Sequence, residues 1–153
     1  MPGIESNTAV KLISEVGADM KPWKTAKHFT SWLGLCPENK ISGGKQLSSR
    51  TKPSANQAAK SFRLAAFGLS RSKTALGGFY RRVQSRHGSA KAITATARKI
   101  AVIFYNMLSK GTEYVEKGLE YYEKEYKERV VNSIARKAAS LGYDMVPIEK
   151  LSS

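Results

Sequence analysis

Four consecutive residues, Ser42-Gly43-Gly44-Lys45, combine the side chains and the backbone freedom that a phosphoryl-transfer site needs. A serine hydroxyl can attack phosphorus where the backbone leaves room for a phosphodiester and cations bear the charge of its oxygens. The two glycines give that room, and Lys45 supplies a cation. Serine and glycine also fill ordinary turns. The sequence therefore leaves two hypotheses: Ser42 is a nucleophile aimed at a DNA phosphate, or part of a turn that holds one.

Further candidates for phosphate binding follow this serine, but no general base does. They are the backbone of Gly43 and the cations Lys45, Arg50, Lys52, Lys60 and Arg63. No His, Asp or Glu lies between residues 39 and 86, so a hydrolase triad cannot be assembled locally. The histidines, His28 and His87, lie far apart, and Cys36 is the only cysteine. We therefore predict no disulfide, no metal site and no cofactor in this chain.

The net charge of +14 comes from one stretch of the chain. Residues 39–112 contain fifteen Lys and Arg and no Asp or Glu, whereas residues 1–38 contain four of each kind. Such one-sided charge favours a polyanionic partner, because neutralising phosphates releases condensed counterions. We therefore predict DNA binding, with Arg81, Arg82 and Arg86 contacting the DNA backbone.

The composition also bounds where the protein works. No run of about 18 apolar residues could span a membrane. The amino terminus lacks the basic-then-apolar order of a secretion signal. We therefore predict a cytoplasmic protein without a membrane partner.

The elements that position these residues are predicted to be mainly α-helices. Apolar spacing and capping residues predict helices from Ser6 or Asn7 to Gly17 and over 23–33, 54–69, 75–87 and 90–110. Inward-facing positions expected in the first two are Val10, Ile13, Val16, Phe29, Trp32 and Leu33. Residues 35–53 contain proline and glycine without apolar periodicity, so we expect an irregular loop or a small β-hairpin to carry Ser42.

The end of the chain, residues 113–153, is predicted to form an amphipathic helix and tail appended to a domain over residues 1–112. One face carries the (i, i+4) acid-to-base pairs Glu113–Lys117, Glu120–Lys124, Glu123–Lys127 and Glu125–Arg129. The other face carries Leu119, Tyr122, Tyr126, Val130 and Ile134. An apolar stripe of this kind lies against the basic domain or against a second copy of the chain, and we expect a homo-oligomer.

Residues 1–17 have the pattern of the second half of a helix-hairpin-helix. In that motif a turn such as Pro2-Gly3-Ile4 directs backbone N–H groups at a phosphate from a helix start. Glu5 stands where the motif usually has glycine, which brings a carboxylate close to the expected phosphate. A structural turn and a DNA contact both stay open for this segment.

Several motifs together resemble the carboxy-terminal domain of the Piv-invertase-like transposases, the insertion-sequence "one-ten" family, which includes bridge-RNA-guided recombinases. The most specific part is Gly34-Leu35-Cys36-Pro37 followed by Ser42-Gly43-Gly44-Lys45. Arg63-Leu64-Ala65-Ala66 comes next, and then Phe79-Tyr80, Gly88, Lys91-Ala92-Ile93 and Ala97-Arg98-Lys99. The resemblance extends over about residues 1–115.

The resemblance implies that Ser42 is the nucleophile that joins covalently to DNA during strand exchange, through a phosphoserine intermediate. In this family the serine works with an RNase H-like domain whose acidic residues hold a divalent metal, expected to be Mg²⁺. Some members also use a guide (bridge) RNA. Because the sequence does not contain that acidic domain, we expect the isolated chain to be inactive and the whole transposase to be the enzyme.

Two other functions remain compatible with the residues. The chain could be a non-enzymatic nucleic-acid-binding module of helix-hairpin-helix type, in which Ser42 only donates a hydrogen bond to phosphate. It could also be an interaction domain that oligomerises through the tyrosine-lined tail helix.

Overall fold

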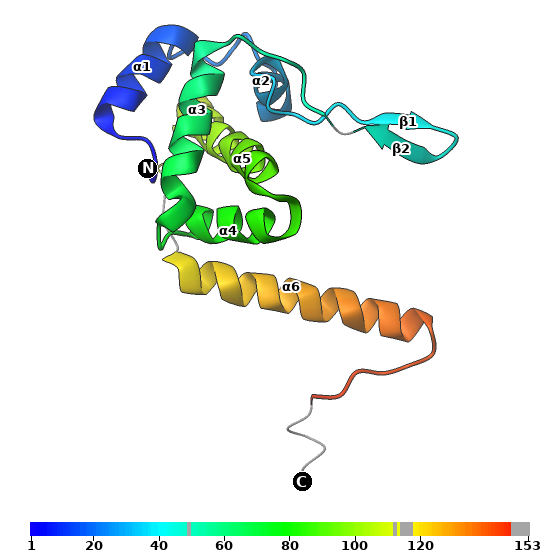
Figure 1. Cartoon of the computed structure of the whole chain (residues 1–153). Helices are drawn as coiled ribbons and strands as arrows, with labels where there is room; N and C mark the ends of the chain where they lie inside the picture. The colour runs from blue at the N-terminus through cyan, green and yellow to red at the C-terminus, as the bar shows by residue number, and fades with distance from the viewer. Residues whose placement is uncertain (49, 112, 114–117, 148–153) are drawn as a thin grey trace.

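The computed structural model describes residues 1–48, 50–111, 113 and 118–147, and it confirms the mainly helical prediction (Figure 1). The elements before the hairpin are α1 (Ser6–Val16) and α2 (Ala26–Trp32), and the hairpin consists of β1 (Lys40–Ser42) and β2 (Lys45–Ser48). The helices that follow are α3 (Gln57–Gly68), the short 3₁₀ turn η1 (Leu69–Arg71), α4 (Ala75–His87), α5 (Ser89–Lys110) and α6 (Gly118–Ser140). No described helix is long and apolar enough to cross a bilayer.

The core forms where α2 and α3 pack against α5. Phe62 of α3 lies between Phe104 of α5 and Phe29 of α2, with ring centroids 5.5 Å and 6.4 Å away. Edge-on aromatic packing of this kind adds to the free energy of apolar burial. Tyr105 donates a hydrogen bond of 2.8 Å to the carbonyl of Trp23, which ties the start of α2 to α5. The core therefore holds the root of the hairpin, since α2 and α3 flank it in sequence.

The inward face predicted for α1 is wrong for Val10 and Ile13, whereas Val16 is half-buried and packs against the core. Leu12 is fully buried, whereas Val10 is 68% exposed and Ile13 is 41% exposed. The helix lies at the edge of the body and packs mainly on α3, so only a narrow strip of its surface is covered. Trp32 at the end of α2 is also more exposed than predicted, at 46%, although its ring lies 5.0 Å from that of Trp23.

Two helices begin later than predicted because different residues cap them. Thr25 accepts a hydrogen bond of 3.2 Å from the amide of His28, so α2 begins after Thr25 rather than at Trp23. Asn56 accepts one of 3.2 Å from the amide of Ala59, so α3 begins after Asn56 rather than after Ser54. The later start of α3 lengthens the connection between the hairpin and the body.

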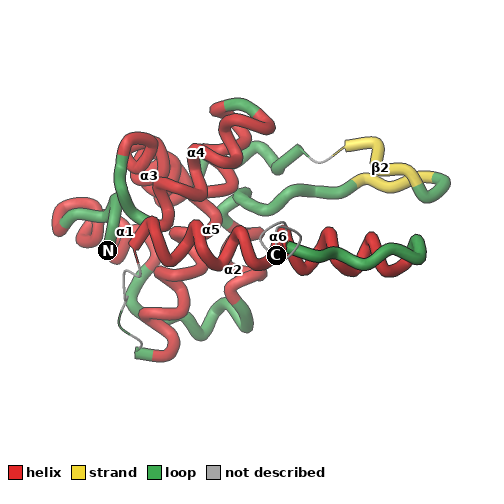
Figure 2. The backbone as a smooth tube through the Cα atoms, turned by 90° about the horizontal axis from the view of Figure 1, so that it is seen from below, coloured by secondary structure: helices red, strands yellow, loops and turns green. Residues whose placement is uncertain are grey.

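The segment expected to be a loop or a small hairpin is an antiparallel β-hairpin that projects from the body (Figures 1 and 2). Gly43 and Gly44 form its two-residue turn with φ values of +56° and +74°. Positive φ at both central residues is the geometry of the primed turns that match strand twist. The side chains of a non-glycine pair would meet no neighbouring atoms, so backbone conformation explains both glycines. A bridge between Pro37 and Thr51 forms the root.

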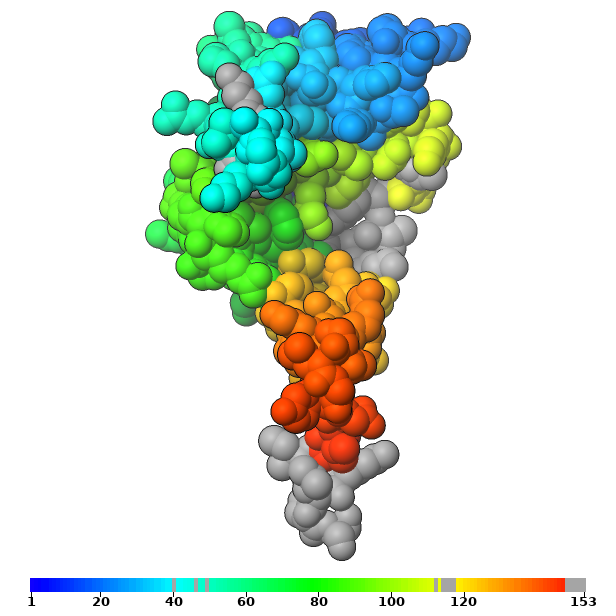
Figure 3. Space-filling view, turned by 90° about the vertical axis from the view of Figure 1, so that its right-hand side faces the viewer, coloured from blue at the N-terminus to red at the C-terminus, as the bar shows by residue number. Residues whose placement is uncertain are grey.

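The carboxy-terminal helix α6 packs along α4 with its first half and extends beyond the body with its second half (Figures 1 and 3). Gly78 of α4 permits this approach, because a Cβ atom there would overlap Leu119 and lie 3.2 Å from the ring of Tyr122. Farther along the same stripe, Ile134 is 52% exposed. The stripe thus meets the basic domain over its first turns. The pair Glu113–Lys117 and the expected boundary at residue 112 fall partly outside the described residues.

Candidate nucleic-acid interface

Ser42 lies at the tip of the hairpin, at the end of β1, and its side chain is exposed. The strand register places it directly opposite Lys45, and side chains of such a pair lie on the same face of the ribbon. The ribbon therefore presents a hydroxyl and an ammonium side by side at a point that a large ligand can reach.

The other cations predicted around Ser42 are not gathered at the tip. Arg50 and Lys52 follow β2 at the hairpin root, while Lys60 and Arg63 belong to α3 in the body (Figure 1). Lys52 forms an ion pair of 3.4 Å with Glu38, and Arg63 donates a hydrogen bond of 3.4 Å to the carbonyl of Gly34. Lys60 is exposed. Of this set, Lys45 alone lies opposite Ser42 in the strand register.

The arginines predicted to contact DNA from α4 contact other groups of the same chain, and we call Arg81, Arg82 and Arg86 the α4 cluster. Arg81 donates hydrogen bonds to the carbonyls of Ser70 and Ser72, at 3.2 Å and 2.7 Å. The Arg82 guanidinium lies 3.5 Å from the centroid of the Tyr126 ring. Arg86 donates a hydrogen bond of 2.7 Å to the hydroxyl of Tyr126. These contacts fasten η1 and α6 to α4.

The contact between α4 and α6 also changes the pKa of Tyr122. Burial raises the pKa of Tyr122 above its ordinary value of 10.0, while the positive charges of Arg82 and Arg129 act in the opposite direction. Arg82 lies 5.2 Å from the centroid of the same ring. The neutral phenol of Tyr122 is therefore the form that suits this interface.

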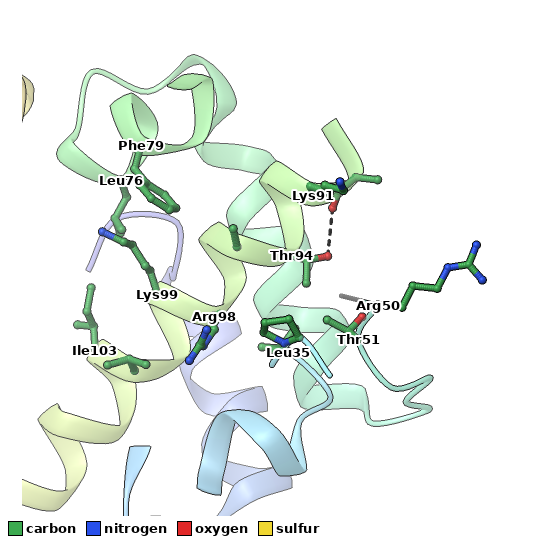
Figure 4. Close-up of a pocket in the computed structure, with 14 residues that line it drawn as sticks. Leu35, Arg50, Thr51, Leu76, Phe79, Lys91, Thr94, Arg98, Lys99 and Ile103 are labelled. Carbon is green, nitrogen blue, oxygen red and sulfur yellow. Dashed lines mark hydrogen bonds between the residues drawn. The ribbon is translucent and has the colours of Figure 1, made fainter. Parts of the chain in front are cut away.

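A groove of about 1040 Å³ runs along α5, between α4 at one end and the hairpin root at the other (Figure 4). Its lining side chains come from four separated segments of the chain and contain no acid. They are Leu35, Pro37, Arg50, Thr51, Leu76, Phe79, Ala90, Lys91, Thr94, Ala95, Arg98, Lys99, Val102 and Ile103. We call Arg50, Lys91 and Arg98 the groove cluster, in which the Arg50 side chain extends outward from the hairpin root, away from the apolar floor (Figure 4). The groove combines an apolar floor with a cationic rim, a composition suited to an amphiphilic anion.

Lys99 closes the α4 end of the groove. Its ammonium lies 4.1 Å from the centroid of the Phe79 ring, within the range of a cation–π contact. Partial burial lowers the pKa of Lys99 below its ordinary value of 10.5, and the nearby charge of Arg129 lowers it further.

Sequence reasoning did not select Lys91, Arg98 and Lys99 as site residues. The sequence feature that could have identified them is their spacing: Arg98 and Lys99 follow Lys91 by seven and eight residues. This spacing places all three on one face of a helix whose other face is buried. Arg50 was predicted as a phosphate-binding residue near Ser42, and not as a neighbour of α5. Its place in the groove depends on the fold, because forty residues separate it from Ala90.

The described residues do not form a metal centre. No group of three or more His, Cys, Asp or Glu side chains there is close enough to hold an ion. The family resemblance implies Mg²⁺ in an RNase H-like domain rather than at Ser42, and the ribbon that carries Ser42 contains no acid that would hold the ion. The arrangement offers an exposed serine hydroxyl, a cation opposite it and a separate cationic groove.

Comparison with known families identifies part of the chain. Residues 1–81 match the model of the family described as "Transposase IS116/IS110/IS902 family". The match contains the whole hairpin with Ser42 and Lys45, and ends within α4. Neither the curated proteins nor the solved structures contain a significant match to the chain.

Proposed function

Because the chain belongs to the IS116/IS110/IS902 family of transposases, we propose that Ser42 is the nucleophile of a DNA strand-exchange reaction. The observation that carries this proposal is the position of Ser42, exposed at the tip of a projecting hairpin and opposite Lys45. A phosphodiester held in a large complex is accessible to such a tip, whereas a serine in the body would be shielded. The surrounding sequence contains no carboxylate that would repel the DNA.

The chemistry is two successive phosphoryl transfers. In the first, the Oγ atom of Ser42 forms a bond to phosphorus, and the bond from phosphorus to one sugar oxygen breaks. The serine proton leaves to a base, and the released sugar oxygen takes up a proton. In the second, a hydroxyl of another DNA end attacks the phosphoserine and restores Ser42. Each step exchanges one phosphoester for another, so strand joining needs no external energy source.

Lys45 has a positioning and electrostatic role in this proposal. Its ammonium lies on the same face of the ribbon as Ser42, where it stabilises charge on the phosphate oxygens during attack. Arg50 at the hairpin root holds the neighbouring phosphate. Lys60 and Arg63 serve the DNA farther along, on the surface of α3.

Proton transfer and metal binding belong to a partner in this proposal, because the ribbon holds no base. An RNase H-like domain of the same transposase supplies the acidic residues, and a guide RNA and a second copy of the chain complete the assembly. The 153-residue chain alone then binds DNA without cleaving it.

A non-enzymatic module is the competing function, favoured by the lack of a base beside Ser42. Its proposed phosphate contact, the Pro2-Gly3 turn, packs on the body instead: a Cβ atom at Gly3 would lie 2.9 Å from the carbonyl oxygen of Ala65. This contact explains Gly3 as a packing residue, so the turn itself gives the competing function little support.

Covalent trapping decides between the two functions. The transposase assembled with its RNase H-like domain should form a protein–DNA adduct that survives denaturation, and peptide mapping should find the DNA on Ser42. Ser42→Ala should abolish the adduct and change DNA affinity by less than about 1 kcal/mol, because one neutral hydrogen bond contributes little net free energy. Ser48→Ala on the same hairpin and Cys36→Ser are the controls. An adduct that persists in Ser42→Ala would exclude this serine as the nucleophile.

A further inference from the structure

We propose that the groove along α5 binds unpaired nucleotides, with their bases against its apolar floor and their phosphates at the groove cluster. This site lies apart from Ser42, and Arg50 at the hairpin root is the one cation that it shares with the proposed serine chemistry. It assigns to the chain a second nucleic-acid contact, for strands whose bases have no pairing partner.

The apolar floor is the reason to expect bases rather than only phosphates. Leu35 and Leu76 are almost fully buried beneath the groove, and Phe79, Val102 and Ile103 are half-buried along it. A duplex keeps its bases stacked inside and presents sugars and phosphates to a protein surface. Unpaired bases expose apolar faces that such a floor can cover, as in proteins that bind single strands.

The rim supplies charge that is free to meet phosphates. In the part of the chain that the structure describes, the side chains of Arg50, Lys91 and Arg98 have no hydrogen-bond or ion-pair partner. The residues that line the groove contain no carboxylate. A polyanion at this rim would therefore displace no internal contact, in contrast to one that approached the α4 cluster.

The dimensions suit a strand of more than one nucleotide. From Lys91 to Ile103 the helix rises by about 18 Å at 1.5 Å per residue. A single strand advances by about 3.4 Å per nucleotide even at duplex spacing, so the floor accommodates several bases. Arg50 and Thr51 at one end also follow β2, so a strand that leaves the groove there meets the hairpin root (Figure 4).

A fluorescence-anisotropy titration of the full chain tests the site with three probes: oligo-dT, oligo-U and a DNA duplex with the same number of phosphates. Ala95→Phe fills the groove without changing charge. We expect this variant to weaken binding of the single strands about tenfold and to leave duplex affinity unchanged. Ala139→Phe, at an exposed alanine of α6, is the matched control and should change neither.

A second variant keeps the test decisive if Ala95→Phe does not fold. Arg98→Gln should reduce the slope of log K against log salt for oligo-dT by about 0.7, the value for one phosphate of a single strand. Arg71→Gln, an exposed arginine on η1, should leave that slope unchanged. Oligo-dT and oligo-U share the base and phosphate chemistry, and their relative affinities identify the preferred strand.

Three results would overturn the proposal. Single-strand affinity could be unchanged in Ala95→Phe and in Arg98→Gln, or duplex affinity could fall as much as single-strand affinity. Sedimentation could instead show self-association that Ala95→Phe abolishes while single-strand binding persists, which would make a second copy the occupant. None of these measurements involves Ser42, so failure of the groove and failure of the serine chemistry are distinguishable.

Discussion

The α4 cluster and the groove cluster each contain three cations of the acid-free stretch, yet the fold uses them differently. Arg81 donates to two backbone carbonyls and Arg86 donates to the Tyr126 hydroxyl, while the Arg82 guanidinium lies over the Tyr126 ring. Arg50, Lys91 and Arg98 have no such partners among the described residues. Positive charge in a sequence therefore does not by itself tell which cations a polyanion can engage.

The physical difference lies in what a phosphate would have to replace. An arginine that satisfies backbone carbonyls leaves them unpaired when it turns outward, and an unpaired buried acceptor costs about 1–3 kcal/mol. When a solvated arginine on the groove rim binds a phosphate, it gives up only bound water and side-chain mobility. The proposal made above therefore assigns polyanion binding to the groove cluster, even though the α4 cluster has the denser basic sequence.

The largest expected effect is on the salt dependence of single-strand binding, which should differ between variants of the two clusters. Replacing Arg50, Lys91 and Arg98 together with Gln should flatten the slope of log K against log salt for oligo-dT by about 2. Replacing Arg81, Arg82 and Arg86 should change that slope by less than about 1, because their charges are engaged internally. Circular dichroism checks that each triple variant folds. Equal flattening by both triples would show that internal partners do not withhold these arginines from nucleic acid.

An intermediate effect is expected on stability, at the glycines of two helices. Gly78→Ala should destabilise the protein by about 1–3 kcal/mol, because its Cβ atom would overlap Leu119 of α6. Gly68→Ala near the end of α3 meets no neighbouring atom and should instead stabilise by about 0.5–1 kcal/mol through helix propensity. Thermal unfolding of both variants measures this. Stabilisation by Gly78→Ala would mean that α6 is not held against α4 in solution.

The smallest expected effect is a pH dependence of the same contact. The pKa of Tyr122 is raised in the folded state, so its stabilising contribution is present below pH 10.0 and is lost as the pH rises through the raised pKa. Arg82 of α4 and Arg129 and Tyr126 of α6 are the groups that act on it. The lowered pKa of Lys99 works in the opposite direction, with stability rising toward pH 10.5.

The comparison of wild type with Tyr122→Phe isolates the tyrosine from Lys99. The melting temperature of wild type should fall more steeply than that of the variant between about pH 9.5 and pH 11. Parallel curves for the two proteins would place Tyr122 outside the pH-dependent contact.

Local sequence patterns predicted the helices well. The features that they did not predict depend on contacts between helices that are distant in sequence. Helix stripes and glycine stops gave α4 and α5 nearly to the residue, because those signals are contained in the segment itself. The exposure of Val10 and Ile13 could not be foreseen, since it depends on which side of α1 faces α3. The internal partners of Arg82 and Arg86 lie forty or more residues away, on α6.

The candidate sites divide in the same way. Ser42, the turn glycines and Lys45 are adjacent in sequence, so their juxtaposition was predictable from turn chemistry. The groove requires residues near 35, 50, 76 and 98 to meet, and no local pattern encodes that meeting. The one trace of it in the sequence was the helical spacing of Lys91 and Arg98, on the uncovered face of α5.

The hairpin tip has few neighbouring atoms in the described part of the chain, and this affects how ordered Ser42 is. Ile41 is 66% exposed, Leu47 is 70% exposed, and nothing lies within 4 Å of a Cβ atom placed on Gly43 or Gly44. A segment with so few neighbours derives its order from its own ladder, and its local opening free energy lies at the low end for a folded protein. If Ser42 is the nucleophile, as proposed above, the tip loses its remaining conformational freedom only when a larger assembly encloses it. Under that proposal, reactivity is a property of the completed complex rather than of the single chain.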